Sequence, residues 1–324
     1  MLSDEDLVRT LVAARFPQWA GLPVSRTGSH GTVNAIYRLG GAMAVRLPLA
    51  EGGARDVEKE HHWLPRLAAH LPVPIPAPLA QGGPGDGYPW VWSVCRWLEG
   101  EPLTRWLGTG RGEQTSGADG SPLDSNELAT DLAQFITALR RVDPAGAPPA
   151  YRSEQLAARD TDTRRTIEAL REALGEEGRE GALAVWRAAL SAPAPDGPGV
   201  WSHGDLQPGN ILIKEGRLGA VIDFGCVGLA DPALDLMAAW YLLPATARPR
   251  FRTALAADDA TWRRARGWAL SVALPELAHY RTTNPVMADN ARRVIGELLA
   301  ERADLRGGVI RAGSDPNAES VREE

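Results

Sequence analysis

Residues 203–213 read HGDLQPGNILI, and residues 214–225 continue as KEGRLGAVIDFG. The runs NILI and LGAVID are apolar and are separated by the turn KEGR, which predicts a β-hairpin. A hairpin brings its two outer ends together, so we expect Asn210 and Asp223 to be neighbours. Asp205 lies on the loop that leads into the hairpin. The stretch therefore predicts two carboxylates and one amide oxygen at a single point.

Oxygen donors of this kind suit Mg²⁺, which takes one or two carboxylates and completes its shell with water and substrate phosphates. With Asn210 and Asp223 as metal ligands, Asp205 is free to orient and deprotonate an attacking hydroxyl. This is the arrangement that phosphoryl transfer needs, because positioning and charge neutralisation supply most of its catalysis. Taken singly, each of the three residues is better explained by an ordinary turn or strand cap, but the three together at this spacing favour the catalytic interpretation.

The same residues carry a resemblance. His203, Asp205 and Asn210 match the H-x-D-x-x-x-x-N catalytic loop of the protein-kinase superfamily, and Asp223-Phe224-Gly225 match its D-F-G metal-binding element. The sequence HGDLQPGN, followed by VIDFG and GLADPALDL, resembles the motifs of the aminoglycoside phosphotransferase family. The resemblance extends over about residues 20–305. This resemblance implies an α+β, bilobal, protein-kinase-like fold, with an antiparallel sheet and a helix in the N-lobe and a mostly helical C-lobe that contains the catalytic hairpin.

The resemblance also implies a function. We expect an ATP-dependent phosphotransferase, with GTP as an alternative nucleotide and Mg²⁺ as cofactor, that moves the γ-phosphoryl group to a hydroxyl of a small molecule. An aminoglycoside or related antibiotic is the first expectation, with a role in antibiotic resistance; a macrolide, another natural product or a small metabolite is the alternative. An inactive nucleotide-binding regulatory module is a second alternative.

A protein kinase is disfavoured. Only seven residues separate Phe224 from Pro232, which is too few for an activation segment with a peptide platform, and no A-P-E follows. Gly204 also replaces the Arg of H-R-D. We therefore expect no switching by phosphorylation of this loop.

The residues that would bind the nucleotide are marked less clearly in the sequence than the catalytic residues. Arg46 occupies the position of the family's lysine on the third strand, and Glu60 lies on the apolar stripe of the next helix, where a buried carboxylate needs a cation. An exposed strand arginine is the alternative for Arg46. Family resemblance places a phosphate-covering loop in TGSHGTVN, which an ordinary hairpin turn explains equally well, and an adenine-binding backbone edge in SVCRWLEG. The residues assigned to these two segments are Ser29, His30 and Gly31, and Val94 and Arg96.

Six further residues complete the expected site. His203 is expected to shape the loop, Asp231 to cap a helix that starts with Pro232, and Asp235 to brace the catalytic loop. Acceptor contacts are expected in PELAHYRTTNP, for which a solvated helix face is the alternative. They are Glu276, Tyr280 and Asn284.

Periodicity and turn residues divide the chain into lobes. Residues 1–98 form a nucleotide-binding N-lobe, with a first helix, strands in LPVSRT, VNAIYRL and AMAVRLP, a helix over 53–71 that Pro65 divides or interrupts, a Pro/Gly-rich loop over 73–89 and a buried strand in WVWSVCRWLEG. Residues 99–305 form the catalytic and acceptor-binding C-lobe, with a polar insertion at 108–122. Helices are predicted at 124–142, 153–174, 178–191, 231–242, 259–281 and 286–303, and a disordered tail at 306–324.

Composition and charge limit the kinds of partner and location that we expect for this protein. The net charge of −6 argues against a nucleic-acid partner, and no apolar run reaches the roughly 18–20 residues of a membrane span. Residues 1–98 hold 9 basic and 8 acidic side chains, against 26 and 33 in residues 99–324, which favours a cationic acceptor in the second lobe. Cys95 and Cys226 lie far apart in apolar runs, which predicts two buried thiols in a reducing compartment, and the N-terminus has acids where a secretory signal needs bases. We expect a cytoplasmic monomer or weak dimer.

Overall fold

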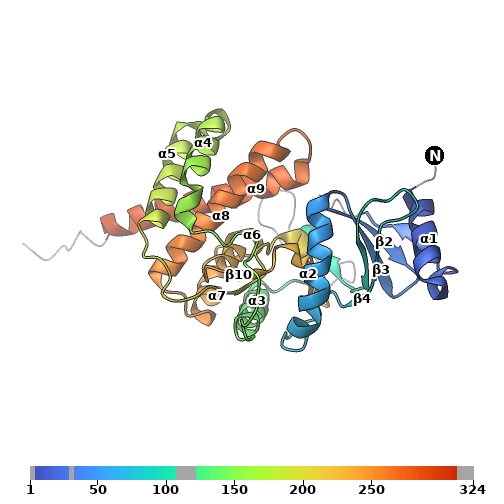
Figure 1. Cartoon of the computed structure of the whole chain (residues 1–324). Helices are drawn as coiled ribbons and strands as arrows, with labels where there is room; N and C mark the ends of the chain where they lie inside the picture. The colour runs from blue at the N-terminus through green and yellow to red at the C-terminus, as the bar shows by residue number, and fades with distance from the viewer. Residues whose placement is uncertain (1–3, 29–32, 107–121, 312–324) are drawn as a thin grey trace, which may run out of the picture.

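The computed structural model describes residues 4–28, 33–106 and 122–311, and the side chains as far as Glu301. A five-stranded antiparallel sheet forms one lobe and a mostly helical body forms the other, with helix α2 at the junction (Figure 1). This is the bilobal α+β architecture that the sequence predicts. The segment Ser29–Gly31 and the polar insertion lie outside the described residues, apart from Pro122.

The N-lobe sheet has the strand order β1-β2-β3-β5-β4. Its core packs the apolar face of helix α1 (Asp4–Arg15) against the sheet. The three strands predicted from Gly-separated runs are confirmed, but a fourth lies inside the segment predicted to be loop. Pro78 begins that strand at the sheet edge, a position that tolerates a proline because no ladder donor is lost inside the sheet. The strands are β1 (Val24–Arg26), β2 (Asn34–Leu39), β3 (Met43–Pro48), β4 (Pro78–Gly82) and β5 (Trp92–Arg96).

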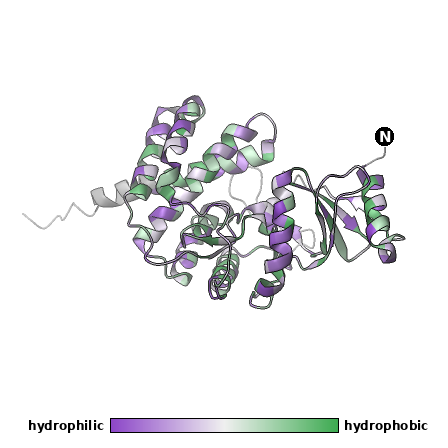
Figure 2. Cartoon of the chain, in the orientation of Figure 1, coloured by the Kyte–Doolittle hydropathy of each residue, from purple (hydrophilic) through white to green (hydrophobic). Residues whose placement is uncertain are grey.

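Helix α2 (Glu51–Ala68) connects the sheet to the C-lobe and stays a single helix through Pro65. The proline stands near the end of the helix, so its missing N–H and its ring disturb only the last turns and do not divide the helix. Val57, Glu60 and Leu64 form a buried stripe that faces the sheet and the other lobe. The rest of the helix is largely hydrophilic, whereas the sheet strands are largely hydrophobic (Figure 2).

The C-lobe packs its helices around one apolar core that also includes residues of α2. The region predicted as one helix over 153–174 is a 3-10 turn, η3 (Leu156–Arg159), followed by a helix that breaks at Leu170. Within α5, Gly175 leaves helical geometry at φ +66°, and the part of the helix after this kink corresponds to the helix predicted at 178–191. The helices are α3 (Ser125–Arg140), α4 (Asp160–Ala169), α5 (Arg171–Leu190), α6 (Ala238–Leu242), α7 (Arg248–Ala254), α8 (Asp259–Tyr280) and α9 (Pro285–Arg311).

Two predicted boundaries change. No continuous helix spans 231–242: a turn leads into the 3-10 helix η6 (Asp235–Met237) and then into the short α6. Helix α9 extends to Arg311, beyond the predicted end and into the segment expected to be a tail. Helix α7 was not predicted at all.

Two small sheets hold the motif region. The predicted hairpin is confirmed as β8 (Ile211–Lys214) and β9 (Arg217–Val221), with β6 (Glu101–Pro102) on the outer edge of β8. Strand β7 (Val200–Ser202) enters the catalytic loop and pairs with β10 (Gly228–Ala230), which leaves the D-F-G element. Both motifs are therefore anchored on each side by β-pairing.

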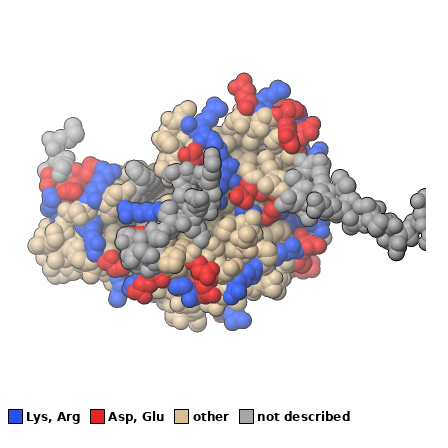
Figure 3. Space-filling model, turned by 180° about the vertical axis from the view of Figure 1, so that it is seen from behind, with Lys and Arg blue, Asp and Glu red and all other residues tan. Residues whose placement is uncertain are grey.

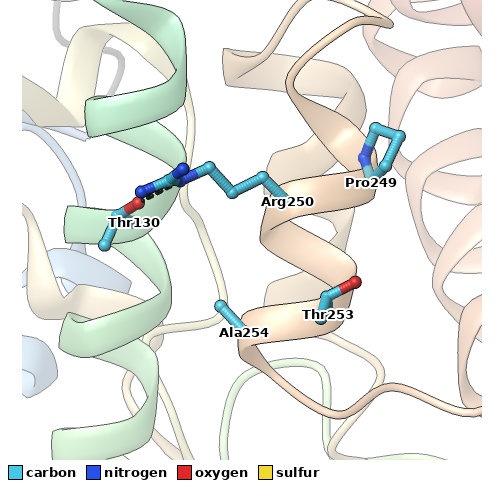
Figure 4. Close-up of a pocket in the computed structure, with 5 residues that line it drawn as sticks. All are labelled: Thr130, Pro249, Arg250, Thr253 and Ala254. Atoms are coloured by element: carbon cyan, nitrogen blue, oxygen red, sulfur yellow. Dashed lines mark hydrogen bonds between the residues drawn. The ribbon is translucent and has the colours of Figure 1, made fainter.

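The described surface is mixed. Acidic and basic side chains are interspersed on the face shown in Figure 3. None of the described helices combines the length and apolar character that a membrane crossing needs. A surface pocket of about 450 Å³ lies between α3 and α7, where Arg250 donates to the hydroxyl of Thr130 at 2.7 Å (Figure 4). Its lining contains none of the predicted site residues, so the pocket is not the site considered below. The lining residues are Thr130, Pro249, Arg250, Thr253 and Ala254.

Candidate active site

The hairpin brings the two motifs together. At its open end the Ile222 N–H donates to the Asn210 carbonyl at 2.9 Å, which joins the end of the catalytic loop to the residue before Asp223. The Asn210 Nδ2 atom donates to the backbone carbonyl of Asp205 at 2.9 Å and to its Oδ2 atom at 3.1 Å. Both partners are acceptors, so they fix the orientation of the Asn210 amide. Among the described residues its Oδ1 atom has no hydrogen-bond partner, so this oxygen is left for a ligand.

Asp223 has a left-handed backbone at φ +63°. A residue other than glycine adopts this conformation only at some cost, and Asp tolerates it better than most. The Asp223 side chain is 43% exposed, and its Oδ1 atom lies 3.6 Å from the guanidinium of Arg46. Phe224, the next residue, is fully buried, so the turn exposes the carboxylate while its neighbour anchors the loop.

The donor set fits Mg²⁺ only with help from a substrate. Asn210 offers one amide oxygen and Asp223 offers an exposed carboxylate, whereas no described cluster of three or more His, Cys, Asp or Glu could enclose a metal. A metal held by few protein oxygens keeps positions for water and phosphate, which is the usual coordination of Mg²⁺ in nucleotide sites. The residues present therefore fit a nucleotide-bound magnesium ion.

The predicted supporting residues lie beneath the loop. The buried carboxylate of Asp235 accepts from the N–H groups of His203 and Gly204, both at 2.8 Å. The His203 Nδ1 atom accepts from the Asp205 N–H at 3.2 Å, which assigns the ring proton to Nε2, 3.1 Å from the Ile222 carbonyl. His203 thus spans both motifs from a fully buried position, and its ring packs edge-on against Phe224.

Asp231 differs from the prediction. Its carboxylate accepts from the Ala233 N–H at 2.8 Å, so it caps a turn rather than the long helix that was expected. The same carboxylate forms an ion pair with Arg264 of α8 at 2.9 Å. Its role in the structure is to fix the segment after β10 to α8.

Arg46 and Glu60 meet as predicted from their positions. The Arg46 Nη1 atom is 2.5 Å from Glu60 Oε2, and the two side chains are 11% and 2% exposed. Burial raises the pKa of Glu60, and the guanidinium of Arg46 opposes that rise. The other carboxylate oxygen of Glu60 is buried without a hydrogen-bond partner among the described residues. Arg46 therefore connects β3, α2 and Asp223.

The segment that is expected to hold the adenine edge, Val94 and Arg96, takes part in the pairing of the N-lobe sheet. Strand β5 is an interior strand, and Val94 pairs with Val45 on one side and with Ala80 on the other. The Arg96 N–H donates to the Ala77 carbonyl at 2.9 Å. These N–H groups are therefore engaged in the sheet, whereas a carbonyl oxygen keeps a second lone pair for a base. The adenine edge at Val94 and Arg96 stays a prediction.

The three predicted acceptor contacts differ in their surroundings. Glu276 accepts from Gln207 at 2.5 Å and from the Tyr241 hydroxyl at 2.9 Å, which places it beside the catalytic loop. Asn284 uses its side-chain oxygen to accept from the Met287 N–H, as a cap of α9. Tyr280 packs its ring against His279 and the edge of the core.

Sequence reasoning missed several residues at the site, among them Arg152 and Lys59. Arg152 donates to the Gly204 carbonyl at 2.7 Å and lies 3.4 Å from Asp205 Oδ1. Lys59 of α2 donates to the Gly225 carbonyl and pairs with Asp56 at 3.0 Å. The chain has 33 arginines and only two lysines, so the rarity of lysine was a signal for Lys59; nothing local marked Arg152.

The segment that forms this site matches a known protein family. The model of the family APH, described as the phosphotransferase enzyme family, matches residues 26–268. No curated protein sequence matches the chain significantly.

Solved structures share the fold over nearly the whole chain. The GDP complex of wild-type aminoglycoside 2'-phosphotransferase-IIIa is 21% identical with a TM-score of 0.71, over 93% of this chain and 100% of that one. The apoenzyme of macrolide 2'-phosphotransferase MphH from Brachybacterium faecium is 23% identical with a TM-score of 0.57, over 90% and 98%. ADP-bound aminoglycoside phosphotransferase APH(2'')-Ib is 14% identical with a TM-score of 0.57, over 92% and 97%.

The catalytic loop, the D-F-G element and the Arg46–Glu60 pair all lie inside the matched residues. The match extends over well more than half of the chain, and the structural similarity extends over both lobes. The chain therefore belongs to the aminoglycoside phosphotransferase family of phosphotransferase enzymes.

Proposed function

We propose that this protein transfers the γ-phosphoryl group of a nucleoside triphosphate to a hydroxyl of a small molecule. The observation that carries the proposal is the cluster at the open end of the β8–β9 hairpin. There Asp205 is bonded to Asn210, and Asn210 is joined through the backbone to the residue before Asp223. The cluster combines a carboxylate base with two oxygen donors for a metal-bound phosphate.

In the proposed step, Asp205 accepts the proton of the acceptor hydroxyl. The hydroxyl oxygen forms a bond to the γ-phosphorus, and the bond between that phosphorus and the β–γ bridging oxygen breaks. The products are a phosphate monoester and a nucleoside diphosphate, and the proton remains on Asp205 until solvent removes it. Asp235 and His203 hold the loop in the conformation that presents Asp205.

Asn210 and Asp223 are the residues that would hold Mg²⁺. When bound, the ion neutralises charge on the phosphates and favours departure of the diphosphate. Arg46 contributes a second cation within reach of the same carboxylate, 3.6 Å from Asp223. Lys59 and Asp235 fix the backbone on either side of this pair of motifs.

The nucleotide is assigned to the interface between residues 1–98 and 99–305. Arg46, fixed by Glu60, is the proposed phosphate-binding cation. The adenine or guanine edge is assigned to the backbone around Val94 and Arg96 and to the connector that follows Trp97, whose own N–H donates to the Ala42 carbonyl. Similar structures carry GDP or ADP by their titles, so we propose ATP with GTP as the alternative.

The proposed acceptor is an aminoglycoside or a related antibiotic, which would give the enzyme a role in resistance. The acidic excess of residues 99–324 supports a cationic acceptor, and Glu276 is the predicted acceptor residue that lies beside the loop. A macrolide is the second candidate, since a macrolide phosphotransferase is among the similar structures. The two isolated cysteines support a reducing, cytoplasmic location, and a monomer or weak dimer is proposed.

The test is turnover by the purified protein. ATP and GTP are each supplied with Mg²⁺ and with a panel of aminoglycosides, macrolides, amino alcohols and sugars, and diphosphate release is followed in a coupled assay. We expect acceptor-dependent release by the wild type and its loss in Asp205→Asn. Equal activity of the two proteins, or equal inactivity across the panel, would refute the proposed function.

A further inference from the structure

Arg152 reaches the catalytic loop from a segment far away in sequence. Residues 149–151 lie along the chain that follows the D-F-G element: the Ala150 N–H donates to the Leu229 carbonyl at 3.0 Å, and the Tyr151 N–H donates to the Cys226 carbonyl at 3.1 Å. This approach requires Gly228, because a Cβ there would lie 2.5 Å from the Ala150 nitrogen. The backbone thus holds Arg152 at a fixed place beside the loop.

The Arg152 guanidinium joins that loop at two points. Nη1 donates to the Gly204 carbonyl at 2.7 Å and to Asp205 Oδ1 at 3.4 Å, and the side chain is 15% exposed. Gly204 has φ +79°, and a Cβ there would lie 3.0 Å from the Cys226 carbonyl oxygen. A side chain at Gly204 would therefore be strained, and the cation beside this loop comes from Arg152, which lies outside it.

Gln207 approaches the same carboxylate oxygen from the other side. Its Nε2 atom donates to Asp205 Oδ1 at 3.2 Å and to Glu276 Oε1 at 2.5 Å. Both partners are carboxylate oxygens, so the amide has one favourable orientation. The Tyr241 hydroxyl donates to the second oxygen of Glu276 at 2.9 Å, which fixes Glu276 in turn.

The two oxygens of Asp205 are therefore unequal. Oδ1 accepts from Arg152 and Gln207, which uses both of its lone pairs, whereas Oδ2 accepts only from Asn210 among the described residues. We propose that Arg152 and Gln207 are positioning residues that occupy Asp205 Oδ1 and so direct Oδ2 to the acceptor hydroxyl. This inference rests on the proposed function, because it names the oxygen that takes the proton in that reaction.

The charge of Arg152 is suited to this role. Burial lowers the pKa of the guanidinium, but the neighbouring Asp205 carboxylate and other nearby groups together raise it by more, so the side chain stays a cation. The contacts to Oδ1 are long, as catalytic hydrogen bonds commonly are before substrate binds. A displaced reacting atom lowers the rate of transfer without weakening nucleotide binding.

The test compares Arg152→Met, Arg152→Lys and a control, Arg165→Met, whose arginine is exposed and pairs only with Asp162 on α4 among its described contacts. We measure kcat and KM for nucleotide and acceptor, and melting temperature with and without nucleotide. Arg152→Met is expected to lower kcat roughly 100-fold, the cost of misplacing a reacting group by about 1 Å. KM for the nucleotide stays unchanged, Arg152→Lys recovers part of the loss, and Arg165→Met matches the wild type.

An unchanged kcat in Arg152→Met would overturn the assignment. A loss that Lys does not relieve and that follows a fall in melting temperature would overturn it as well, since a merely structural arginine predicts that pattern. Gln207→Leu provides the second arm and is expected to lower kcat with the same unchanged nucleotide KM. A wild type that neither transfers phosphate nor hydrolyses nucleotide would refute the proposed function itself, whereas an active wild type with an equally active Arg152→Met refutes only this inference.

Discussion

Replacing Arg46 with Ala gives a large and specific loss of stability. The substitution removes the partner of Glu60, whose side chain is 2% exposed and whose other oxygen has no partner among the described residues. Breaking a buried ion pair from one side costs about 3–5 kcal/mol, because the remaining charge is left uncompensated. We expect a loss of that size in the free energy of unfolding at pH 8.

The pH dependence of this loss follows from Glu60. Burial raises the pKa of its carboxyl and Arg46 opposes that rise, so removal of Arg46 raises the pKa further. The folded variant then binds a proton that the unfolded chain has already released, and its stability falls as the pH rises. The defect is therefore expected to be smaller at pH 5 than at pH 8.

Urea unfolding of the purified variant at the two pH values measures both effects. Arg55→Ala is the matched control, because Arg55 lies on the same helix as Glu60 and its pair with Glu51 is exposed on both sides. It is expected to leave stability unchanged. A loss below about 1 kcal/mol in Arg46→Ala, the range of an exposed pair, would show that this pair does not have the buried character described.

Other substitutions test separate parts of the site. Asp205→Asn is expected to lower kcat by roughly 10²–10⁴-fold while the nucleotide Kd measured by calorimetry stays unchanged; a lower affinity instead would mean that Asp205 binds nucleotide rather than acting as base. Asp223→Asn should raise the Mg²⁺ concentration that gives half-maximal rate, and an unaltered Mg²⁺ titration would exclude Asp223 as a ligand. Asp235→Asn replaces one of the two carboxylate oxygens that accept from the His203 and Gly204 N–H groups, so the free energy of unfolding should fall by about 1–3 kcal/mol in a thermal denaturation. An unchanged stability would show that other contacts hold the loop. Burial raises the pKa of Glu276 to about 7, so its contribution to stability is lost as the pH rises from the unfolded value of about 4.3 to 7, and Glu276→Gln should flatten the urea-unfolding midpoints between pH 5 and 8.

The local parts of the site could be predicted from the sequence. The hairpin depends on two apolar runs and a turn that lie next to each other, so the meeting of Asn210 with the Asp223 segment follows from neighbours in the chain. Helical spacing placed Glu60 on the buried stripe, and Arg46 was the cation on the facing strand. The hairpin and the stripe needed only short-range geometry, whereas Arg46 was identified from the family resemblance.

The errors concern contacts that local pattern does not encode. Within the Pro-rich residues 73–89, Pro78–Gly82 form an edge strand because Trp92–Arg96 is available to pair with them. Asp231 stands before a proline, as helix caps do, yet its ion pair with Arg264 holds a turn. Arg152 lies 52 residues from Gly204 and is one of 33 arginines. Only the tertiary fold distinguishes it from the others.

The central claim is that Asp205 promotes transfer of a phosphoryl group to a small-molecule hydroxyl. The most direct measurement is mass spectrometry of each acceptor after incubation with MgATP or MgGTP and either the wild type or Asp205→Asn. The account predicts that an acceptor gains the mass of one phosphoryl group with the wild type alone, with an equal amount of nucleoside diphosphate formed. Phosphorylated acceptor in equal yield from both proteins, or none from the wild type with any acceptor, would contradict it.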